Sequence, residues 1–171
     1  MNVTLRAARA DDAAATEQIE TEADTLLIDR FSAVSWPPPT PAADRERMPG
    51  FVLVAEHSAD PTATTAVVGF VHVLDLDGHA HLEQLSVLPG FGRRGIGRLL
   101  VEGAQTEARR RGHAEMTLRT YIDVPWNAPF YETCGFVTTA PQTPALLGLV
   151  QVEEALGLFE FGARVQMTAA L

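Results

Sequence analysis

The sequence predicts an α/β domain of the α+β kind, and three observations lead to it. The length of 171 residues suits one domain with one hydrophobic core. Segments rich in valine and phenylalanine at 51–56 and 66–74 predict neighbouring antiparallel strands joined by a proline-containing connection. The Asp77-Gly78 pair then predicts a tight turn into a third strand at 81–88, after which the pattern changes to that of a helix.

The N-terminal part of the chain predicts one strand, one helical region and one loop. Val3 and Leu5 alternate with polar residues, which predicts a strand over 2–8. The acidic and alanine-rich stretch at 10–29 is typical of a helix. Prolines between residues 35 and 50 remove hydrogen-bond donors and fix the backbone, so we expect a surface loop there without helix or inner strand.

The strongest helix signal lies at 95–111. Its apolar and small residues recur on one helix face, three consecutive arginines lie at its C-terminal end, and Gly112 is a stop signal. The remaining expected elements are a strand at 116–121, a short helix that Asn127 caps and Gly135 ends, a helix at 146–158 and a strand at 163–171. The sequence shows no repeat and no linker, so we expect a single domain over 1–171.

Composition excludes several classes of partner. The formal net charge of −9 opposes general nucleic-acid binding, which needs a basic surface. Cys134 is the only cysteine, so no internal disulfide or multi-cysteine zinc site can form, and we expect no metal. No signal peptide is evident, and no apolar run approaches the roughly 20 residues that span a bilayer. We expect a soluble, cytoplasmic protein without nucleic-acid or membrane partners, and a homodimer is left open.

The segment "LPGFGRRGIGRLLVEGAQ" places glycines and arginines at the start of the helix at 95–111. These residues are Gly92, Gly95 and Gly97, with Arg93, Arg94 and Arg98. Bare N–H groups at the positive end of a helix dipole favour an anion, and guanidinium groups add forked donors for phosphate oxygens. A tight helix start with solvated arginines explains the glycine spacing equally well, so both interpretations stay open on spacing alone.

Two known phosphate-binding loops match this segment poorly. A P-loop has a lysine and then a serine or threonine after its last glycine, whereas Arg98 and Leu99 follow Gly97 here. A dinucleotide-binding loop has the order GxGxxG inside a parallel βαβ unit, whereas the order here is GxxGxG after an expected hairpin. The first loop is excluded and the second is disfavoured.

Two motifs together resemble the GCN5-related N-acetyltransferase (GNAT) superfamily. "LSVLPGFGRRGIGRLL" resembles its acetyl-coenzyme A binding segment, which reads Q or R, two residues, G, one residue, then G or A. "NAPFYETCGF" resembles its second motif, an aromatic-Tyr pair followed closely by Gly-Phe. Their order and separation agree with the family over residues 50–140. Gly92 departs from the pattern, because the family has Gln or Arg there as a donor to the pyrophosphate, and Arg93 or Arg94 can replace it.

The resemblance implies a fold, a reaction and a co-substrate. The fold is a single mixed, mostly antiparallel sheet of about 6–7 strands with about 4–5 helices, splayed between the fourth and fifth strands. The reaction is direct transfer of an acetyl group from acetyl-coenzyme A to a primary amine of a small molecule or peptide. The implied cofactor-binding residues are Leu85, Ser86 and Val87 through their backbone, then Arg93, Arg94, Gly95, Ile96, Gly97, Arg98 and Asn127.

Glu83 is the candidate general base, acting directly or through a water molecule. With period two it shares a strand face with His81 and Leu85, where desolvation is expected to raise the pKa of its carboxyl group. A solvent-facing strand residue is the alternative. His72 and His81 are rival bases.

Tyr131 is the candidate general acid. Its place in "FYETCGF" matches the family tyrosine that stands near the thioester sulfur, and a phenol with a pKa of about 10 can protonate a thiolate. A packed aromatic side chain is the alternative. Cys134 has no basic partner nearby in the sequence, so we do not expect it to carry an acyl group.

The sequence does not identify the acceptor. The resemblance places the acceptor groove between the first helices, their connecting loop and the last two strands. Phe31 and Trp36 are candidates for an apolar wall, and Asp29 or Asp44 for attracting a cation, although a solvated loop explains the same residues. Two alternative functions are a catalytically silent module that senses acyl-coenzyme A and a transferase of longer acyl groups.

Overall fold

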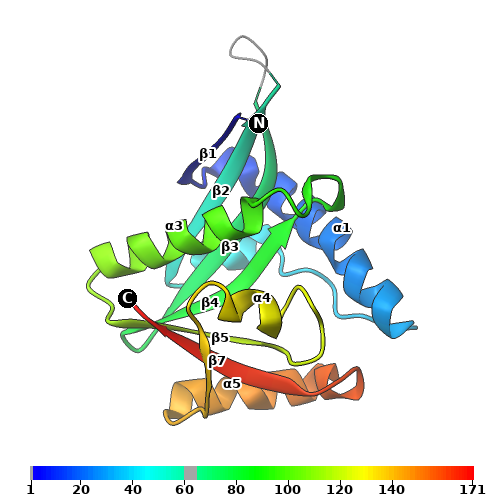
Figure 1. Cartoon of the computed structure of the whole chain (residues 1–171), viewed down its shortest axis with the longest axis vertical. Helices are drawn as coiled ribbons and strands as arrows, with labels where there is room; N and C mark the ends of the chain where they lie inside the picture. Colours follow the sequence, from blue (N-terminus) through cyan, green and yellow to red (C-terminus); the bar gives the residue numbers. More distant parts are fainter. Residues whose placement is uncertain (1, 60–64) are drawn as a thin grey trace. The chain divides into compact units, whose positions relative to one another are not determined.

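The computed structural model describes residues 2–59 and 65–171, whose strands form one seven-stranded sheet in the order β1-β2-β3-β4-β5-β7-β6 (Figure 1). The chain divides into two compact units. The first comprises Met1–Val73 and Gln84–Ala104, and the second comprises Leu74–Glu83 and Gln105–Leu171.

The strands agree with those expected, apart from one that was missed. Their bounds are β1 Asn2–Ala7, β2 Gly50–Ser58, β3 Ala66–Leu76, β4 His79–Val87, β5 Glu115–Tyr121, β6 Val137–Thr139 and β7 Arg164–Ala170. The α-helices are α1 Ala13–Phe31, α2 Ala42–Arg47, α3 Ile96–Arg110, α4 Ala128–Glu132 and α5 Pro144–Ala155. Three 3-10 turns are η1 Ala10–Asp12, η2 Pro89–Phe91 and η3 Leu158–Glu160.

In the first unit, β1 pairs with β2 in antiparallel fashion along its whole length. A cluster of Ile19 from α1, Val54 from β2 and Phe70 from β3 forms part of the core, and each is at most 2% exposed. Figure 1 shows α1 and α2 in this unit with β1, β2 and the start of β3. Burial of these apolar faces holds the sheet and the two helices together.

The expectation of a loop throughout residues 35–50 is wrong, because α2 lies inside it. Pro41 occupies the N-cap of α2, and the residues after it are free of proline and include good helix formers. Arg45 of α2 is buried and pairs with Glu20 of α1, which ties this short helix to the long one. A contact this distant in sequence leaves no local pattern.

The first part of α3 packs closely on the first unit, as its predicted apolar face requires. Leu100, Val101 and Ala104 are fully buried. A Cβ atom added at Gly103 would lie 2.5 Å from Cδ1 of Leu5, so a larger residue there would force the end of the Leu5 side chain to move.

In the second unit, the predicted turn at Asp77-Gly78 is confirmed. Both residues have positive φ, 52° and 87°, as a type I′ hairpin turn requires. The carboxylate of Asp75 accepts a hydrogen bond from the Gly78 N–H at 2.9 Å. The turn joins the end of β3 to the start of β4.

The mixed, mostly antiparallel sheet is confirmed. β4 and β5 pair in parallel over Ala80–Leu82 and Met116–Leu118, while β7 is antiparallel to both β5 and β6. β4 continues beyond this parallel register to Val87. The sequence did not predict β6, whose three residues are too short for a periodic signal.

Helix α5 is joined to the sheet of the second unit by a buried ionic cluster. The Glu153 carboxylate accepts hydrogen bonds at 2.8 Å from Arg119 of β5 and at 2.8 Å from Arg164 of β7. Figure 1 shows α5 running beside β7. Leaving any of these charges buried without its partner would be costly.

Candidate functional site

The loop between β4 and α3 presents its backbone at a helix start, within the first unit. The Leu88 N–H donates to the carbonyl of Val68 in β3 at 2.9 Å, so the loop begins beside β3, directly after the end of β4. Arg93 and Gly95 then adopt positive φ, 58° and 81°. The first hydrogen bond of α3 runs from the Leu99 N–H to the Gly95 carbonyl, so the N–H groups before Leu99 precede the intrahelical donors. Such a helix start favours an anion.

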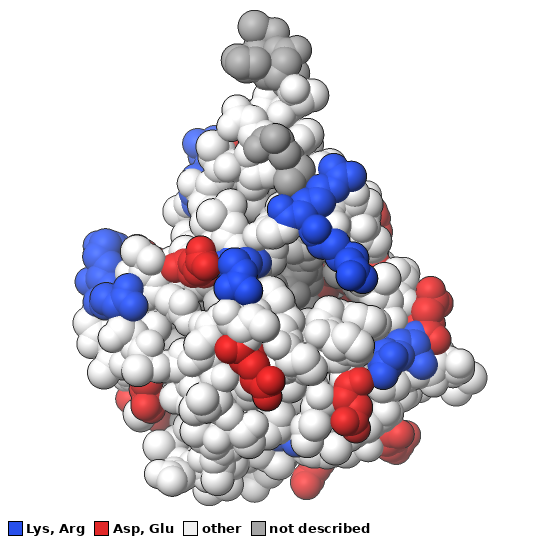
Figure 2. Space-filling view, in the orientation of Figure 1, with Lys and Arg blue, Asp and Glu red and all other residues white. Residues whose placement is uncertain are grey.

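Arginine side chains surround this helix start. Arg93 and Arg94 are exposed, and the Arg94 guanidinium lies 5.4 Å from the ring centre of Phe91. Arg98 lies 3.9 Å from Glu102 one turn along α3. Figure 2 shows basic side chains gathered over the loop that leads into α3. Positive charge and bare backbone therefore occur together, as the sequence predicted.

The end of β4 lies against β3, also within the first unit. Ser86 is 2% exposed, and its hydroxyl accepts a hydrogen bond from the Gln84 amide at 2.9 Å. A Cβ atom at Gly69 of β3 would lie 3.0 Å from the Ser86 carbonyl oxygen, so the two backbones are in close contact. Leu85 and Val87, on either side of Ser86, are half-buried.

The second unit holds Glu83 and His81. The Glu83 side chain is 39% exposed, so the expected burial among apolar neighbours is wrong. The reason is that Glu83 directly follows Leu82, the last residue paired with β5. His81 is buried, its Nδ1 lies 2.8 Å from the Thr117 hydroxyl, and its Nε2 lies 3.6 Å from the Glu83 carboxylate.

Burial also weakens both histidines as bases. Desolvation, and secondarily the charge of Arg119, lowers the pKa of His81 to about 3. Desolvation, and secondarily the charge of Arg45, lowers the pKa of His72 to about 4. Both imidazoles are neutral at pH 7, and such low pKa values make them poor acceptors of a proton from an ammonium group.

Tyr131 lies on α4 among aromatic rings in the second unit. Its ring centre is 5.7 Å from that of Phe136 and 5.1 Å from that of Phe130, and the residue is 8% exposed. Burial raises the pKa of its phenol well above the usual value. Among residues 2–59 and 65–171, no hydrogen bond engages its hydroxyl. The side chain is thus packed and firmly protonated at pH 7.

Asn127 occupies the N-cap of α4, but the predicted side-chain cap is wrong. Its side chain accepts no capping hydrogen bond, and its backbone N–H instead donates to the Val124 carbonyl at 2.9 Å. Gly135 ends this segment with φ of 88°, as expected. Cys134 is half-buried, and its carbonyl accepts a hydrogen bond from Gln105 at 3.1 Å.

The candidate apolar wall is partly formed in the first unit. The rings of Phe31 and Trp36 are stacked with centres 6.4 Å apart. The Trp36 indole donates to Asp24 at 3.1 Å, and burial raises the pKa of Asp24 to about 6. The sequence missed Asp24 and proposed Asp29 or Asp44 instead. Asp44 is exposed and lies 3.4 Å from Arg47.

Two features are absent from the described residues. None of the described helices has the length and hydropathy needed to cross a bilayer. In the same part of the chain, no three or more histidine, cysteine, aspartate or glutamate side chains are grouped so that they could hold a metal ion.

Comparisons with known proteins agree with the motifs and the fold. Over nearly its whole length the chain is similar to three solved structures. The ribosomal-protein-S18-alanine N-acetyltransferase of Escherichia coli is 18% identical with a TM-score of 0.67, and the match covers 99% of this chain and 94% of that one. PaiA N-acetyltransferase of Thermoplasma acidophilum in complex with coenzyme A is 16% identical with a TM-score of 0.67, and the match covers 100% of both chains. Rv2747 of Mycobacterium tuberculosis in complex with CoA is 20% identical with a TM-score of 0.66, and the match covers 98% of this chain and 99% of that one. The sequence model of the acetyltransferase (GNAT) family matches residues 16–136. The chain therefore belongs to the acetyltransferase (GNAT) family.

Proposed function

We propose that this acetyltransferase transfers an acetyl group from acetyl-coenzyme A to a primary amine of a small molecule or peptide. The observation that carries the proposal is the helix start at the beginning of α3, where Arg93 and Gly95 have positive φ and exposed guanidinium groups are adjacent. Two structurally similar proteins were solved with coenzyme A, which supports the same cofactor here.

The proposed cofactor contacts are mainly made by backbone groups. The N–H groups and arginines of the helix start bind the diphosphate, and the end of β4 binds the pantetheine arm as an added strand would. The amide of Asn127, which does not cap α4, contacts the cofactor. The proposed residues are Leu85, Ser86, Val87, Arg93, Arg94, Gly95, Ile96, Gly97, Arg98 and Asn127.

The proposed chemistry uses one carboxylate and one phenol. Glu83 accepts a proton from the amine, directly or through water, and the amine nitrogen attacks the thioester carbon. A carbon–nitrogen bond forms, the carbon–sulfur bond breaks, and Tyr131 gives its proton to the leaving thiolate. The low pKa values of His72 and His81 favour Glu83 as the base, and the raised pKa of Tyr131 keeps its phenol protonated at pH 7.

An assay of thiol release tests this proposal. We expect acetyl-coenzyme A to release thiol faster in the presence of some members of a broad panel of primary amines. Mass spectrometry should find the acetylated amine. If no amine raises thiol release above background hydrolysis, catalysis is contradicted.

A sensing module is the second candidate, and two observations favour it. Gly92 removes a donor that the family pattern has, and Glu83 is more exposed than a buried base would be. This candidate predicts that coenzyme A stabilises the protein by about 2.7 kcal/mol at a hundredfold excess over its Kd. It also predicts that Glu83→Gln and Tyr131→Phe change nothing. Mass spectrometry of co-purified ligand distinguishes a longer acyl group from acetyl.

A further inference from the structure

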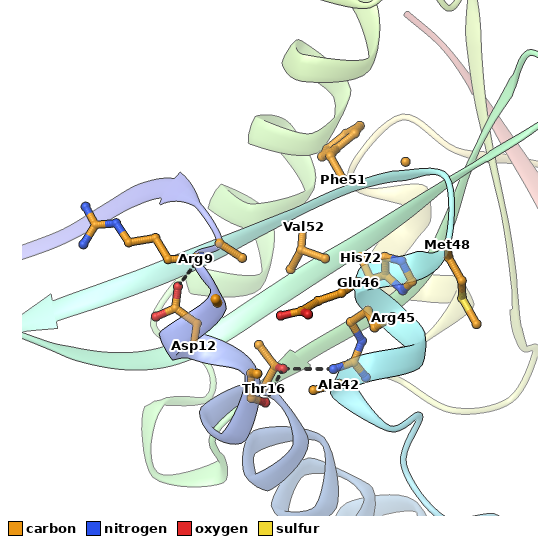
Figure 3. Close-up of a pocket in the computed structure, with 14 residues that line it drawn as sticks. Arg9, Asp12, Thr16, Ala42, Arg45, Glu46, Met48, Phe51, Val52 and His72 are labelled. Carbon is orange, nitrogen blue, oxygen red and sulfur yellow. Dashed lines mark hydrogen bonds between the residues drawn. The ribbon is translucent and has the colours of Figure 1, made fainter.

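Helix α2 forms one wall of a cavity of about 360 Å³ in the first unit (Figure 3). Its residues in the lining are Ala42, Arg45 and Glu46. Figure 3 shows Arg45 reaching from α2 to Thr16 of α1 through a dashed hydrogen bond. We call residues 32–50, which run from the end of α1 to the start of β2, the strap. Access to the cavity past α2 depends on whether the strap stays in place.

Side chains of α1 hold the helix of the strap. The N–H of Ala42, the first residue of α2, donates to the Glu17 carboxylate. Arg45 is 4% exposed, donates to the Thr16 hydroxyl at 3.0 Å and pairs with Glu20. In the part of the chain that the structure describes, no other hydrogen bond joins α2 to a different element. Because a helix of six residues is not stable alone, α2 depends on its contacts with α1.

Side chains of α1 also hold the connection that precedes α2. The Trp36 indole donates to the Asp24 carboxylate at 3.1 Å, and the backbone of Thr40 donates to Glu20. Four prolines between residues 37 and 41 carry no N–H, so this connection has few backbone donors of its own. Two carboxylates one helical turn apart therefore accept hydrogen bonds from the strap.

The carboxylates of α1 under the strap outnumber the cations that the structure describes there. Glu20 is buried and Asp24 is half-buried. Arg45 pairs with Glu20, whereas within residues 2–59 and 65–171 no positively charged side chain pairs with Asp24. Glu17, half-buried on the preceding turn, adds a third carboxylate. The closed strap thus covers more negative than positive charge, and uptake of one proton would reduce this excess.

The charged groups of the neighbouring elements do not balance that excess. His72 of β3 is neutral at pH 7, because burial lowers its pKa to about 4. In η1, Asp12 already pairs with Arg6 at 2.6 Å, and η2 contains no charged residue. The remaining charged residues of α2 are exposed, and they are Asp44, Glu46 and Arg47.

Burial raises the pKa values of both carboxylates that hold the connection. The pKa of Asp24 rises to about 6, although the hydrogen bond from Trp36 opposes the rise. The pKa of Glu20 rises to about 7, with the charge of Arg45 opposing burial and that of Asp24 adding to it. Release of the strap would return these values towards the ordinary 3.8 and 4.5. The closed strap therefore holds a proton more tightly, so a falling pH favours closure and a pH above about 7 favours release.

We propose that the strap is a proton-controlled cover of this cavity, closed when Glu20 and Asp24 share a proton and released when both are ionised. The ends of the strap, Ser32 and Gly50, lie at the termini of α1 and β2 with φ of 50° and 141°, and such positions suit hinges. Release moves the wall formed by α2 and opens the cavity. The proposal involves no cofactor, so it does not depend on the proposed function.

Hydrogen exchange of the whole chain at pH 5 and pH 8, read by mass spectrometry, tests the proposal. Each exchange rate is divided by that of an unstructured peptide at the same pH, which gives a protection factor. We expect the amides of 42–48 to be about tenfold more protected at pH 5, because a proton with a pKa of about 6 is lost by pH 8. Equal protection, or stronger protection at pH 8, would overturn the proposal. The same change in the amides of β2 would show opening of the whole unit and would also overturn it.

A pair of variants on α1 locates the proton. Asp24→Asn keeps an acceptor for Trp36 but cannot ionise, so α2 should be as protected at pH 8 as at pH 5. Asp29→Asn removes the same charge from an exposed position of the same helix and should keep the tenfold difference. A difference that persists in Asp24→Asn, or that is lost in both variants, would contradict the assignment. Circular dichroism checks the fold of both variants, and the pH dependence of the unchanged protein is a test that needs neither.

Exchange is measured without coenzyme A, which separates this proposal from the proposed function. If thiol release responds to amines while the protection of α2 does not respond to pH, the strap proposal fails alone. If the protection of α2 follows pH and depends on Asp24 while no amine is acetylated, the strap proposal holds and the transfer proposal fails.

Discussion

The loop that leads into α3 is exposed to solvent, whereas the surroundings of Tyr131 are buried. Arg93, Arg94 and Gly95 are exposed, and the loop offers backbone N–H groups and guanidinium charges to a ligand. Tyr131 is almost fully buried between Phe130 and Phe136, and that burial keeps its phenol protonated. Under the proposed function, cofactor binding depends on backbone conformation at a few positions, whereas we propose that the chemistry depends on one hydroxyl group.

The largest effect is expected on kcat when the buried residue Tyr131 is changed. Tyr131→Phe removes the proton donor and keeps the ring packing, so kcat should fall about 10²- to 10⁴-fold while the Kd for coenzyme A stays the same. Tyr121→Phe is the matched control, because its hydroxyl donates to the Leu158 carbonyl at 2.9 Å. Steady-state kinetics and calorimetry measure the two quantities. Equal losses of kcat in both variants would contradict the proposal that Tyr131 is the proton donor.

Acid should destabilise the protein through its buried histidines. The pKa of His81 is about 3 in the folded protein, against about 6.5 when unfolded. The unfolded chain therefore takes up a proton first as the pH falls below about 6.5, and the free energy of unfolding should drop by about 1.4 kcal/mol per pH unit towards pH 3.

Urea unfolding at a series of pH values measures this slope. His81→Gln should flatten it, and His79→Gln, at a more exposed position on the same strand, is the matched control. A slope that is unaltered by His81→Gln would show that the imidazole is not held neutral by burial.

A smaller effect is expected on the affinity for coenzyme A when Gly95 in the exposed loop is changed. Gly95→Asp places a side chain at φ of 81° and a negative charge at the helix start, so the affinity for coenzyme A should fall about 10²-fold. Gly90→Asp is the control, because a Cβ there also meets open space but the backbone has no positive φ. Thermal shift in the presence of coenzyme A compares the two. Equal behaviour would contradict a conformational role for Gly95.

The smallest effect is expected for the arginines themselves. Arg94→Ala should weaken coenzyme A only a fewfold, and the difference should shrink at high salt, because exposed charges are screened. Arg109→Ala, at the C-terminal end of α3, should have no effect. Calorimetry at low and high ionic strength measures both. A loss insensitive to salt would indicate that Arg94 makes a buried contact with the cofactor.

Local signals predicted much of the fold. The turn at Asp77-Gly78 and the helix α3 follow from dihedral preference and from apolar periodicity, which act over a few residues. The strands β2 and β3 follow from runs of β-branched and aromatic residues. These features depend on neighbours in sequence, so the sequence alone suffices for them.

Tertiary contacts decided the features that the sequence missed. Helix α2 depends on the pairing of Arg45 with Glu20, and the exposure of Glu83 depends on where β5 stops pairing with β4. Asn127 was rightly placed at a helix start, but its side chain does not cap. The cavity in the first unit is lined by residues of η1, α1, α2, β2 and β3, so no local motif indicates it.

Direct titration with coenzyme A and with pantetheine, which lacks the diphosphate, tests the central claim that the helix start of α3 holds a diphosphate. We predict a measurable heat of association with coenzyme A and an affinity for pantetheine at least about 10²-fold weaker, since the charge-assisted contacts are lost. Equal affinities, or no association with coenzyme A, would contradict the account.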